Sequence, residues 1–305
     1  MSFFQLGFII KNRREELQLS QEELADGICS VSTLSRIENG DRIPSKNNYE
    51  MLMQRLGYSA ISMDYFTDKT DFIMHELKFK IRHAYIEEDF TLCRQLLEEF
   101  CDLPGERNHV DTQFIALYDT ILNKRVVLWE ETLERLEAAL RLTCPKYGKD
   151  FAPKVLSYEE IVILNNIALC YKAMEQRPRA IELFYTVKNY YDRQISSPEE
   201  ALRTQPMILY NLSSALGLEG RYDECIAVCD EAISLVRRTY RYANYEKTLY
   251  NRAWSLLRRN REGDREAARN SLQQAYRFAY AVDNQKLMRI FEDFYRKNFS
   301  EELSI

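Results

Sequence analysis

The sequence has 305 residues, which is enough for more than one hydrophobic core and makes two domains the default expectation. Its 46% hydrophobic and 29% charged residues are typical of a soluble globular protein, and the lack of any run of about 18 apolar residues argues against a membrane-spanning helix. The net charge of −5 counts against a protein that attracts nucleic acid through its overall charge.

Cysteines, histidines and motifs give no sign of catalysis. The seven cysteines, an odd number without a CxxC pair, are typical of reduced thiols, so we expect a cytoplasmic protein. The three histidines share no metal-ligand spacing, and no phosphate-binding glycine loop or nucleophile–base motif stands out. We therefore expect no metal site, no cofactor and no enzymatic activity. The acidic pairs Glu98-Glu99 and Glu159-Glu160 are interpreted as solvated faces of amphipathic helices.

The first two predicted helices are indicated by apolar spacing and by a cap. Residues 5–17 place apolar side chains along one stripe, so we expect a helix there. Ser20 is followed three positions later by Glu23, and this pair predicts a capping box at the start of a second helix. A break at residues 27–29 ends that helix.

A third predicted helix follows the break. Ser30 can cap it, and residues 31–38 bury Leu34 and Ile37. The opposite face is polar and consists of Ser32, Thr33, Ser35 and Arg36. Two short helices, a tight turn and a polar outer face predict a helix-turn-helix that reads DNA.

Two further short helices complete this domain. Residues 45–56 carry apolar positions that close a core, and residues 61–66 form a fifth helix. We therefore expect a DNA-binding domain over residues 1–66 and a polar junction over residues 67–70. Acidic and basic side chains balance within the domain, so one copy should bind DNA weakly. We accordingly expect a homodimer on a palindromic site.

Residues 71–305 are helical in pattern throughout and contain an internal repeat. The repeat alternates large and small apolar positions, which lets paired helices approach closely, as in tetratricopeptide repeats. It fits most clearly at residues 164–187, 209–232 and 249–275, and more weakly at 71–103 and 110–143. The expected fold class is therefore all-α, with about five helix pairs in a tetratricopeptide-like superhelix rather than an unrelated helical bundle.

A last helix over residues 282–299 is expected to cap this stack. The side chains that would cover the apolar face of the last repeat are Leu287, Ile290, Phe291 and Phe294. Cys225 and Cys229 fall on packing positions of the repeat, so they are interpreted as core residues.

The three clear repeats have an asparagine at the same position, namely Asn166, Asn211 and Asn251. Asparagine is a mediocre helix former, whereas its amide can pair with the backbone of an extended peptide. We therefore expect these amides to line a peptide-binding groove. The same face would gain pockets and positive charge from Tyr210, Ser214, Tyr250, Trp254, Lys172, Lys247 and Arg258. Packing between helices is the alternative role for the three aromatic residues.

Two segments, LSQEELA and STLSRIENG, together with Arg42 and Pro44, resemble the Xre-type helix-turn-helix of bacterial regulators. The shortened turn in LADGICSVSTLSRIENG and the repeats behind it are similar to the PlcR/Rgg (RNPP) family of peptide-sensing regulators. The resemblance implies a structural ion pair between Arg14 and Glu38. It also implies a phosphate contact by Gln21, and Arg36 is the strongest candidate for a base or backbone contact. The full set of expected DNA-contacting residues is Gln21, Ser30, Val31, Ser32, Thr33, Arg36, Arg42 and Lys46.

These expectations combine into a bacterial transcriptional regulator that binds a short signalling peptide, as in quorum sensing. A peptide in the groove would change the curvature of the superhelix, and with it the spacing of the two DNA-binding domains. Two alternatives stay open: repeats that scaffold a folded protein partner, and a ligand-independent repressor. The length of the repeat domain argues against the second, because a small dimerisation module would suffice.

Overall fold

The computed structural model describes residues 3–56, 69–123, 127–148, 151, 156–193 and 199–303. Within these ranges every regular element is a helix, so the all-α fold class is confirmed. None of the described helices combines the length and apolar character that crossing a membrane requires. The chain divides into two compact units, Met1–Cys170 with Asp192–Ala201, and Tyr171–Tyr191 with Leu202–Ile305.

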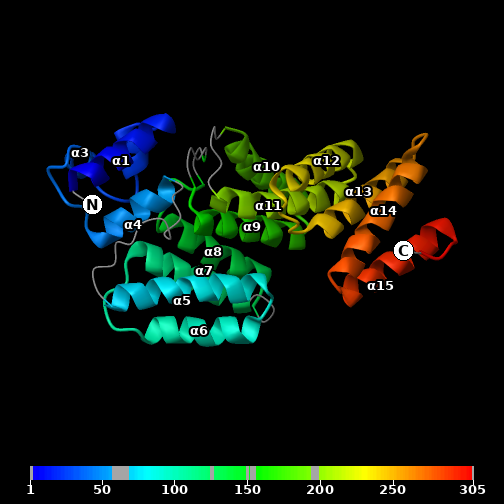
Figure 1. Ribbon diagram of the computed structural model, residues 1–305, viewed down its shortest axis with the longest axis horizontal. Coiled ribbons are helices and arrows are strands. Elements are labelled where there is room, and N and C mark those ends of the chain that lie inside the picture. The colour runs from blue at the N-terminus through cyan, green and yellow to red at the C-terminus, as the bar shows by residue number, and fades with distance from the viewer. Residues whose placement is uncertain are drawn as a thin grey trace. The chain divides into compact units, whose positions relative to one another are not determined.

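The N-terminal part of the first unit is a four-helix cluster in the residues described (Figure 1). Its helices are α1 (Phe3–Glu16), α2 (Gln21–Ala25), α3 (Val31–Glu38) and α4 (Lys46–Arg55). Leu24, Leu34 and Leu52 have no exposed surface and form the centre of its core. The predicted fifth helix over residues 61–66, and part of the predicted junction, lie outside the described residues.

The N-caps of this cluster follow the local sequence. The capping box at Ser20 and Glu23 is confirmed, because each residue's backbone N–H donates to the other's side chain, at 2.8 and 3.1 Å. Ser30 accepts from the backbone N–H of Thr33 at 3.2 Å and so caps α3, and Ser45 caps α4 in the same way. Each hydroxyl satisfies a backbone donor that has no partner in the first helical turn.

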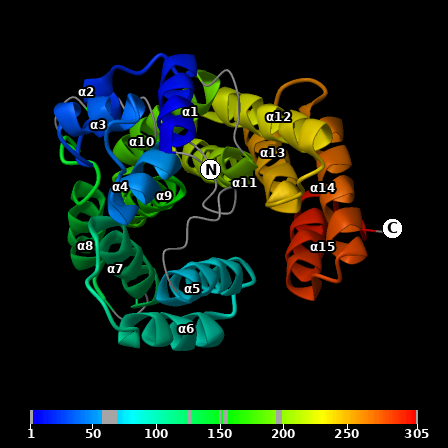
Figure 2. The ribbon, with the colours of Figure 1, turned by 60° about the vertical axis from the view of Figure 1, so that its left-hand side comes forward.

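The rest of the first unit is built from longer helices. They are α5 (Lys69–Ile86), α6 (Phe90–Asp102), α7 (His109–Asn123), α8 (Trp129–Arg141) and α9 (Tyr158–Ala173), the last of which continues into the second unit. Helix α5 packs against α6, and α7 packs against α8, as Figure 2 shows. These pairs coincide with the weaker copies of the predicted repeat.

The second unit contains most of α10 (Arg177–Arg193) and of α11 (Glu199–Leu218), together with α12 (Tyr222–Thr239), α13 (Tyr245–Arg259), α14 (Asp264–Ala281) and α15 (Gln285–Phe299). Helices α12 to α15 each pack against the next one in the chain. The small residues Ala253, Ala268 and Ala275 have no exposed surface, because facing helices approach closely at these positions.

Two expectations about exposure are wrong. Ile290 was expected to cover the last repeat, but 42% of its surface is exposed, while Phe291 and Tyr295 on the same helix are buried. Glu159 and Glu160 were expected to face solvent, but each is only 1% exposed. Their carboxylates are paired with arginines from distant parts of the sequence, which offsets the cost of burying the charge.

Candidate functional site

A buried ion pair joins the first and third helices of the N-terminal cluster. The guanidinium of Arg14 donates to both carboxylate oxygens of Glu38, at 2.6 and 3.0 Å. It also donates to the carbonyl oxygen of Leu19 at 2.7 Å, and Gln21 Nε2 donates to Glu38 Oε2 at 2.8 Å. The hydrogen bond to Glu38 raises the pKa of Arg14. The side chain of Gln21 is therefore held beside this pair, at the start of α2.

Helices α1 and α3 touch through a glycine. A Cβ atom at Gly7 would lie 2.2 Å from the carbonyl oxygen of Ile37 and 2.9 Å from that of Glu38. Only a residue without a side chain allows this approach, which fixes α3 on the surface of the cluster.

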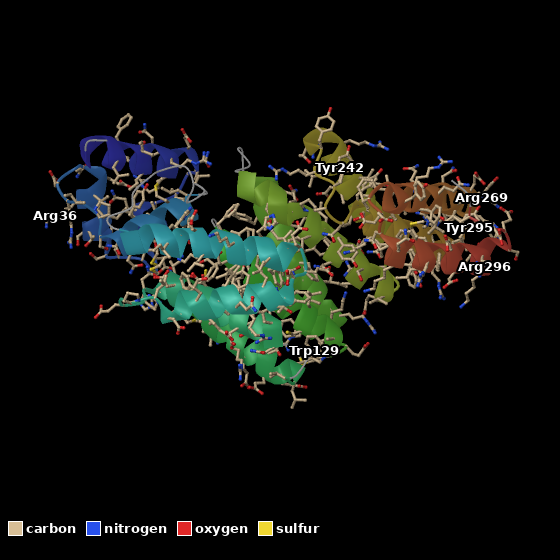
Figure 3. The ribbon with its side chains drawn as sticks, turned by 60° about the horizontal axis from the view of Figure 1, so that its bottom comes forward. Arg36, Trp129, Tyr242, Arg269, Tyr295 and Arg296 are labelled. Atoms are coloured by element: carbon tan, nitrogen blue, oxygen red, sulfur yellow. The ribbon has the colours of Figure 1, made fainter. Side chains whose placement is uncertain are left out.

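The outer face of α3 carries polar side chains that reach the surface of the cluster. Ser32 and Arg36 are exposed, and Val31 is 40% exposed. Ser30 Oγ lies 3.0 Å from Ser32 Oγ and 2.9 Å from Thr33 Oγ1, so the three hydroxyls form one local network. Within the described part of the chain Arg36 has no carboxylate partner, and Figure 3 shows it at the outer edge of the cluster, directed away from it.

The other two residues predicted to contact DNA lie beyond α3. Arg42 is exposed, and its backbone N–H donates to the carbonyl oxygen of Arg36 at 3.1 Å, which ties the following turn to the end of α3. The side chain of Lys46 lies outside the described part of the structure.

Helix α4 is joined to the repeat helices of the first unit by Arg55. Its guanidinium donates to the carbonyl oxygen of Thr143 at 2.7 Å and to that of Asp26, and it lies 3.5 Å from Glu160 Oε1. Thr143 Oγ1 also donates to Glu160, at 2.6 Å. Burial would raise the pKa of Glu160, but Arg55 and these hydrogen bonds hold it below its ordinary value.

The first turn of α9 positions both carboxylates. Ser157 and Glu160 form a capping box, with Ser157 N–H donating to Glu160 at 2.7 Å and Glu160 N–H donating to Ser157 Oγ at 3.2 Å. Arg82 of α5 donates to the neighbouring Glu159 at 2.6 Å. The SxxE pattern of this box is visible in the sequence and was missed.

A cavity of about 210 Å³ lies in the second unit, between α11, α12 and α13. Holding one water takes about 10–15 Å³ on the same scale, so the cavity accommodates a much larger group. Its lining residues are Ser213, Ser214, Gly217, Leu218, Cys225, Tyr250, Asn251, Trp254 and Ser255. Four of the residues predicted for the peptide-binding face are therefore brought together here: Ser214, Tyr250, Asn251 and Trp254.

The polar groups of this cavity are largely bonded to one another. Asn251 Nδ2 donates to Ser213 Oγ at 2.9 Å, and Ser213 Oγ donates to the carbonyl oxygen of Tyr210 at 2.8 Å. Ser255 Oγ donates to Cys225 Sγ at 3.0 Å. Asn251 Oδ1 accepts no hydrogen bond from the residues that the structure describes. The amide of Asn251 is therefore oriented with its acceptor unused.

The three predicted cations lie near this region without carboxylate partners among the described residues. Lys172 Nζ donates to Ser214 Oγ at 3.2 Å, and burial lowers the pKa of Lys172. Arg258 stacks over the ring of Trp254 at 5.2 Å. Lys247 Nζ lies 6.0 Å from the ring centroid of Tyr210.

The other two asparagines have different surroundings. Asn166, in the first unit, is 5% exposed, and its Nδ2 donates to the carbonyl oxygen of Val162 one turn earlier at 2.8 Å. Asn211, in the second unit, is 8% exposed. Asn251 lines the cavity, whereas these two are buried, and peptide binding by all three stays a prediction.

Comparisons with known proteins identify the fold. Residues 10–61 match the family model described as Helix-turn-helix. The comparison with curated proteins gives no match. PlcR from Bacillus thuringiensis, solved with the peptide PapR7 and DNA, aligns at 20% identity and a TM-score of 0.61, covering 94% of this chain and 99% of that one.

Two structures of ComR also match. ComR from S. thermophilus, solved with DNA and its signalling peptide ComS, aligns at 18% identity and a TM-score of 0.51, covering 96% of this chain and 99% of that one. The apo form of ComR from Streptococcus vestibularis aligns at 18% identity and a TM-score of 0.51, covering 98% of this chain and 99% of that one. The expected architecture, a helix-turn-helix domain followed by a helical repeat-like body, is thereby confirmed as the fold that this chain shares with PlcR and ComR.

Proposed function

We propose that this protein is a DNA-binding transcriptional regulator whose repeat helices bind a short signalling peptide. The observation that carries this proposal is the combination of a helix-turn-helix match at residues 10–61 with the fold of PlcR, which was solved with both a peptide and DNA. A fold alone does not define a function, but the exposed face of α3 and the cavity of the second unit support the proposal independently of it.

The DNA-binding part of the proposal rests on α3. Ser32 and Arg36 are exposed on one face of α3, and Arg36 has no ion pair with any described residue, as a helix that enters the major groove requires. Hydroxyl groups bond to bases and phosphates alike, so Arg36 supplies most of the specificity. The chain carries a net charge of −5, so a homodimer on two half-sites about 34–36 Å apart gives the avidity that one copy lacks.

The peptide-binding part rests on the cavity of the second unit. Aromatic walls suit an apolar side chain, and Asn251 Oδ1, which accepts no hydrogen bond from any described residue, suits a backbone N–H of an extended peptide. A cavity of about 210 Å³ fits one or two side chains, whereas a folded partner helix would need a longer apolar groove. The observations thus favour a short peptide over a scaffolded protein.

Regulation then follows from linkage between the two sites. A peptide that binds one arrangement of the repeat helices more tightly shifts the population toward it, and the affinity for DNA changes by the same coupling energy. A coupling of about 1–3 kcal/mol changes DNA affinity roughly 5- to 150-fold, which is enough to switch a promoter.

Two selections with the full-length protein test the proposal. In the first, a pool of random duplex DNA is incubated with wild type and with Arg36→Ala, and the retained sequences are read. We expect a palindromic motif for the wild type and a weaker or altered motif for the variant. In the second, immobilised protein captures peptides from a pool of synthetic heptapeptides. If the retained DNA shares no sequence motif, sequence-specific DNA binding is contradicted. If no peptide is enriched, peptide binding is contradicted.

A further inference from the structure

The basic residues of helix α13 differ in whether a carboxylate pairs with them. Arg252 Nε meets Asp230 Oδ1 at 2.6 Å, and so has the counter-ion that a partly buried cation needs. Lys247 and Arg258, on the same helix, have aromatic rings beside them but no carboxylate among the residues that the structure describes. Lys247 and Arg258 thus form no ion pair with the described residues, although the charge of Glu246 lies close enough to Tyr210 to help raise the pKa of its hydroxyl.

Lys172 shows the same imbalance more strongly. Its ammonium group is bonded to the hydroxyl of Ser214, which lines the cavity, and no carboxylate of the described chain neutralises it. Removal from water penalises a charged amine, which is why the pKa of Lys172 is lowered. An anionic group placed next to Lys172 would offset this penalty. Lys172 therefore has the properties of a receptor for an anion.

The adjacent cavity has the properties of a receptor for an apolar group. Trp254, Tyr250 and Leu218 form its apolar walls. The Trp254 ring packs closely against Gly217, since a Cβ atom at that glycine would lie 3.3 Å from the ring. Since the donors of Ser213, Ser255 and Asn251 are already satisfied within the protein, an apolar group can enter without breaking a hydrogen bond.

We propose that the cavity binds one apolar side chain of the ligand, that Lys172 binds a carboxylate beside that side chain, and that Asn251 Oδ1 accepts an N–H of the intervening backbone. The inference rests on the proposed function and specifies its ligand: an anionic peptide with an apolar residue next to a carboxylate. Lys247 and Arg258 add a positive field that favours such a peptide over a neutral or basic one. The carboxylate is either the C-terminus of the peptide or the side chain of an acidic residue.

The test uses the peptides that the full-length protein retains from the heptapeptide pool. Each is resynthesised in three forms: unchanged, with its C-terminus amidated, and with each acidic residue replaced by its amide. We expect one of the two changes to weaken binding at least tenfold, and which one does so identifies the source of the carboxylate. Equal affinity of all three forms overturns the inference while leaving the proposed function intact. If the full-length protein retains no peptide at all, the proposed peptide-binding function itself is contradicted.

Two variants test whether the ligand carboxylate binds at Lys172. Lys172→Met keeps the apolar stem and removes the charge, so we expect it to lose the tenfold preference for the carboxylate form and to bind the neutral form as the wild type does. Lys286→Met, on the exposed surface of α15 and outside the cavity lining, is the matched control and should keep the preference. A Lys172→Met protein that keeps the preference overturns the assignment, and an unchanged circular dichroism spectrum verifies that the variant is folded.

Discussion

The guanidinium of Arg55 on α4 lies 3.5 Å from the carboxylate of Glu160 on α9, and both side chains are buried. The same guanidinium bonds the carbonyl oxygen of Thr143, so the pair joins the N-terminal cluster to the repeat helices of the first unit. Removing one partner of such a pair leaves a buried charge without compensation, which costs far more than the pair itself contributes.

Arg55→Ala is therefore expected to destabilise the protein by about 3–5 kcal/mol. The measurement is urea unfolding of the full chain. Arg135→Ala, which breaks a half-exposed i,i+4 pair with Glu131, is the control and should cost no more than about 0.5 kcal/mol. Equal effects of the two substitutions would contradict a special role for Arg55.

The stability that Glu160 provides should depend on pH. Its pKa in the folded protein lies below the ordinary value of 4.5, so the folded state binds fewer protons than the unfolded chain in this range. The contribution is then present above about pH 4.5 and is lost as the pH falls through the folded-state pKa. Urea midpoints of wild type and Glu160→Gln, measured from pH 7 to pH 3, should converge as the pH decreases. A constant difference would show that Glu160 does not titrate as argued.

Gly7→Ala tests the contact between α1 and α3. Alanine normally stabilises a helix by about 0.4–1 kcal/mol relative to glycine. Here the new Cβ would lie 2.2 Å from a backbone oxygen of α3, so we expect a loss of about 1–3 kcal/mol and a displaced α3. Thermal unfolding measures the first effect, and the affinity for the selected DNA measures the second. A stabilised variant would mean that the two helices do not pack in this way.

Arg36→Ala should weaken specific DNA binding by about 1–3 kcal/mol, or roughly 5- to 150-fold, and leave the fold intact. The reason is that Arg36 is exposed and makes no ion pair with the described residues. Fluorescence anisotropy on the selected duplex gives the affinity, and circular dichroism verifies the fold. An unchanged affinity would show that the DNA-contacting surface does not include Arg36 in the C-terminal half of α3.

Lys172→Met should raise the Tm of the ligand-free protein even though it impairs anion binding. Burial lowers the pKa of Lys172 below 10.5, so the unfolded chain binds more protons between the two values and wild-type stability rises with pH across that window. The variant should lack this rise. Differential scanning calorimetry at pH 7 and at alkaline pH provides the comparison. A lower Tm for Lys172→Met at pH 7 would show that the charge is compensated within the protein.

Local chemistry made much of the fold predictable. Ser20, Ser30 and Ser45 cap the helices that follow them, because a cap depends on residues only three positions away. The close-packed alanines at 253 and 268 were likewise predictable, since helical spacing defines which face is buried.

The errors concern partners that are distant in the sequence. Glu159 is buried because Arg82, 77 residues earlier, neutralises it, and no local pattern contains that information. Asn166 and Asn251 occupy the same repeat position, yet the first bonds its own helix and the second faces a cavity. Spacing predicts the side of a helix on which a residue lies, but not how closely neighbouring helices cover it.

Glu160 has two roles at once, because it completes the capping box of α9 and also serves as the counter-ion of Arg55. Fraying of the first turn of α9 would withdraw that counter-ion, and departure of Arg55 would leave the capping carboxylate with an unneutralised charge. The amide proton of Ser157, which is bonded to Glu160 at 2.7 Å, is therefore a natural reporter. Its exchange rate with deuterated solvent would record how often the N-terminal cluster lifts from the helices behind it.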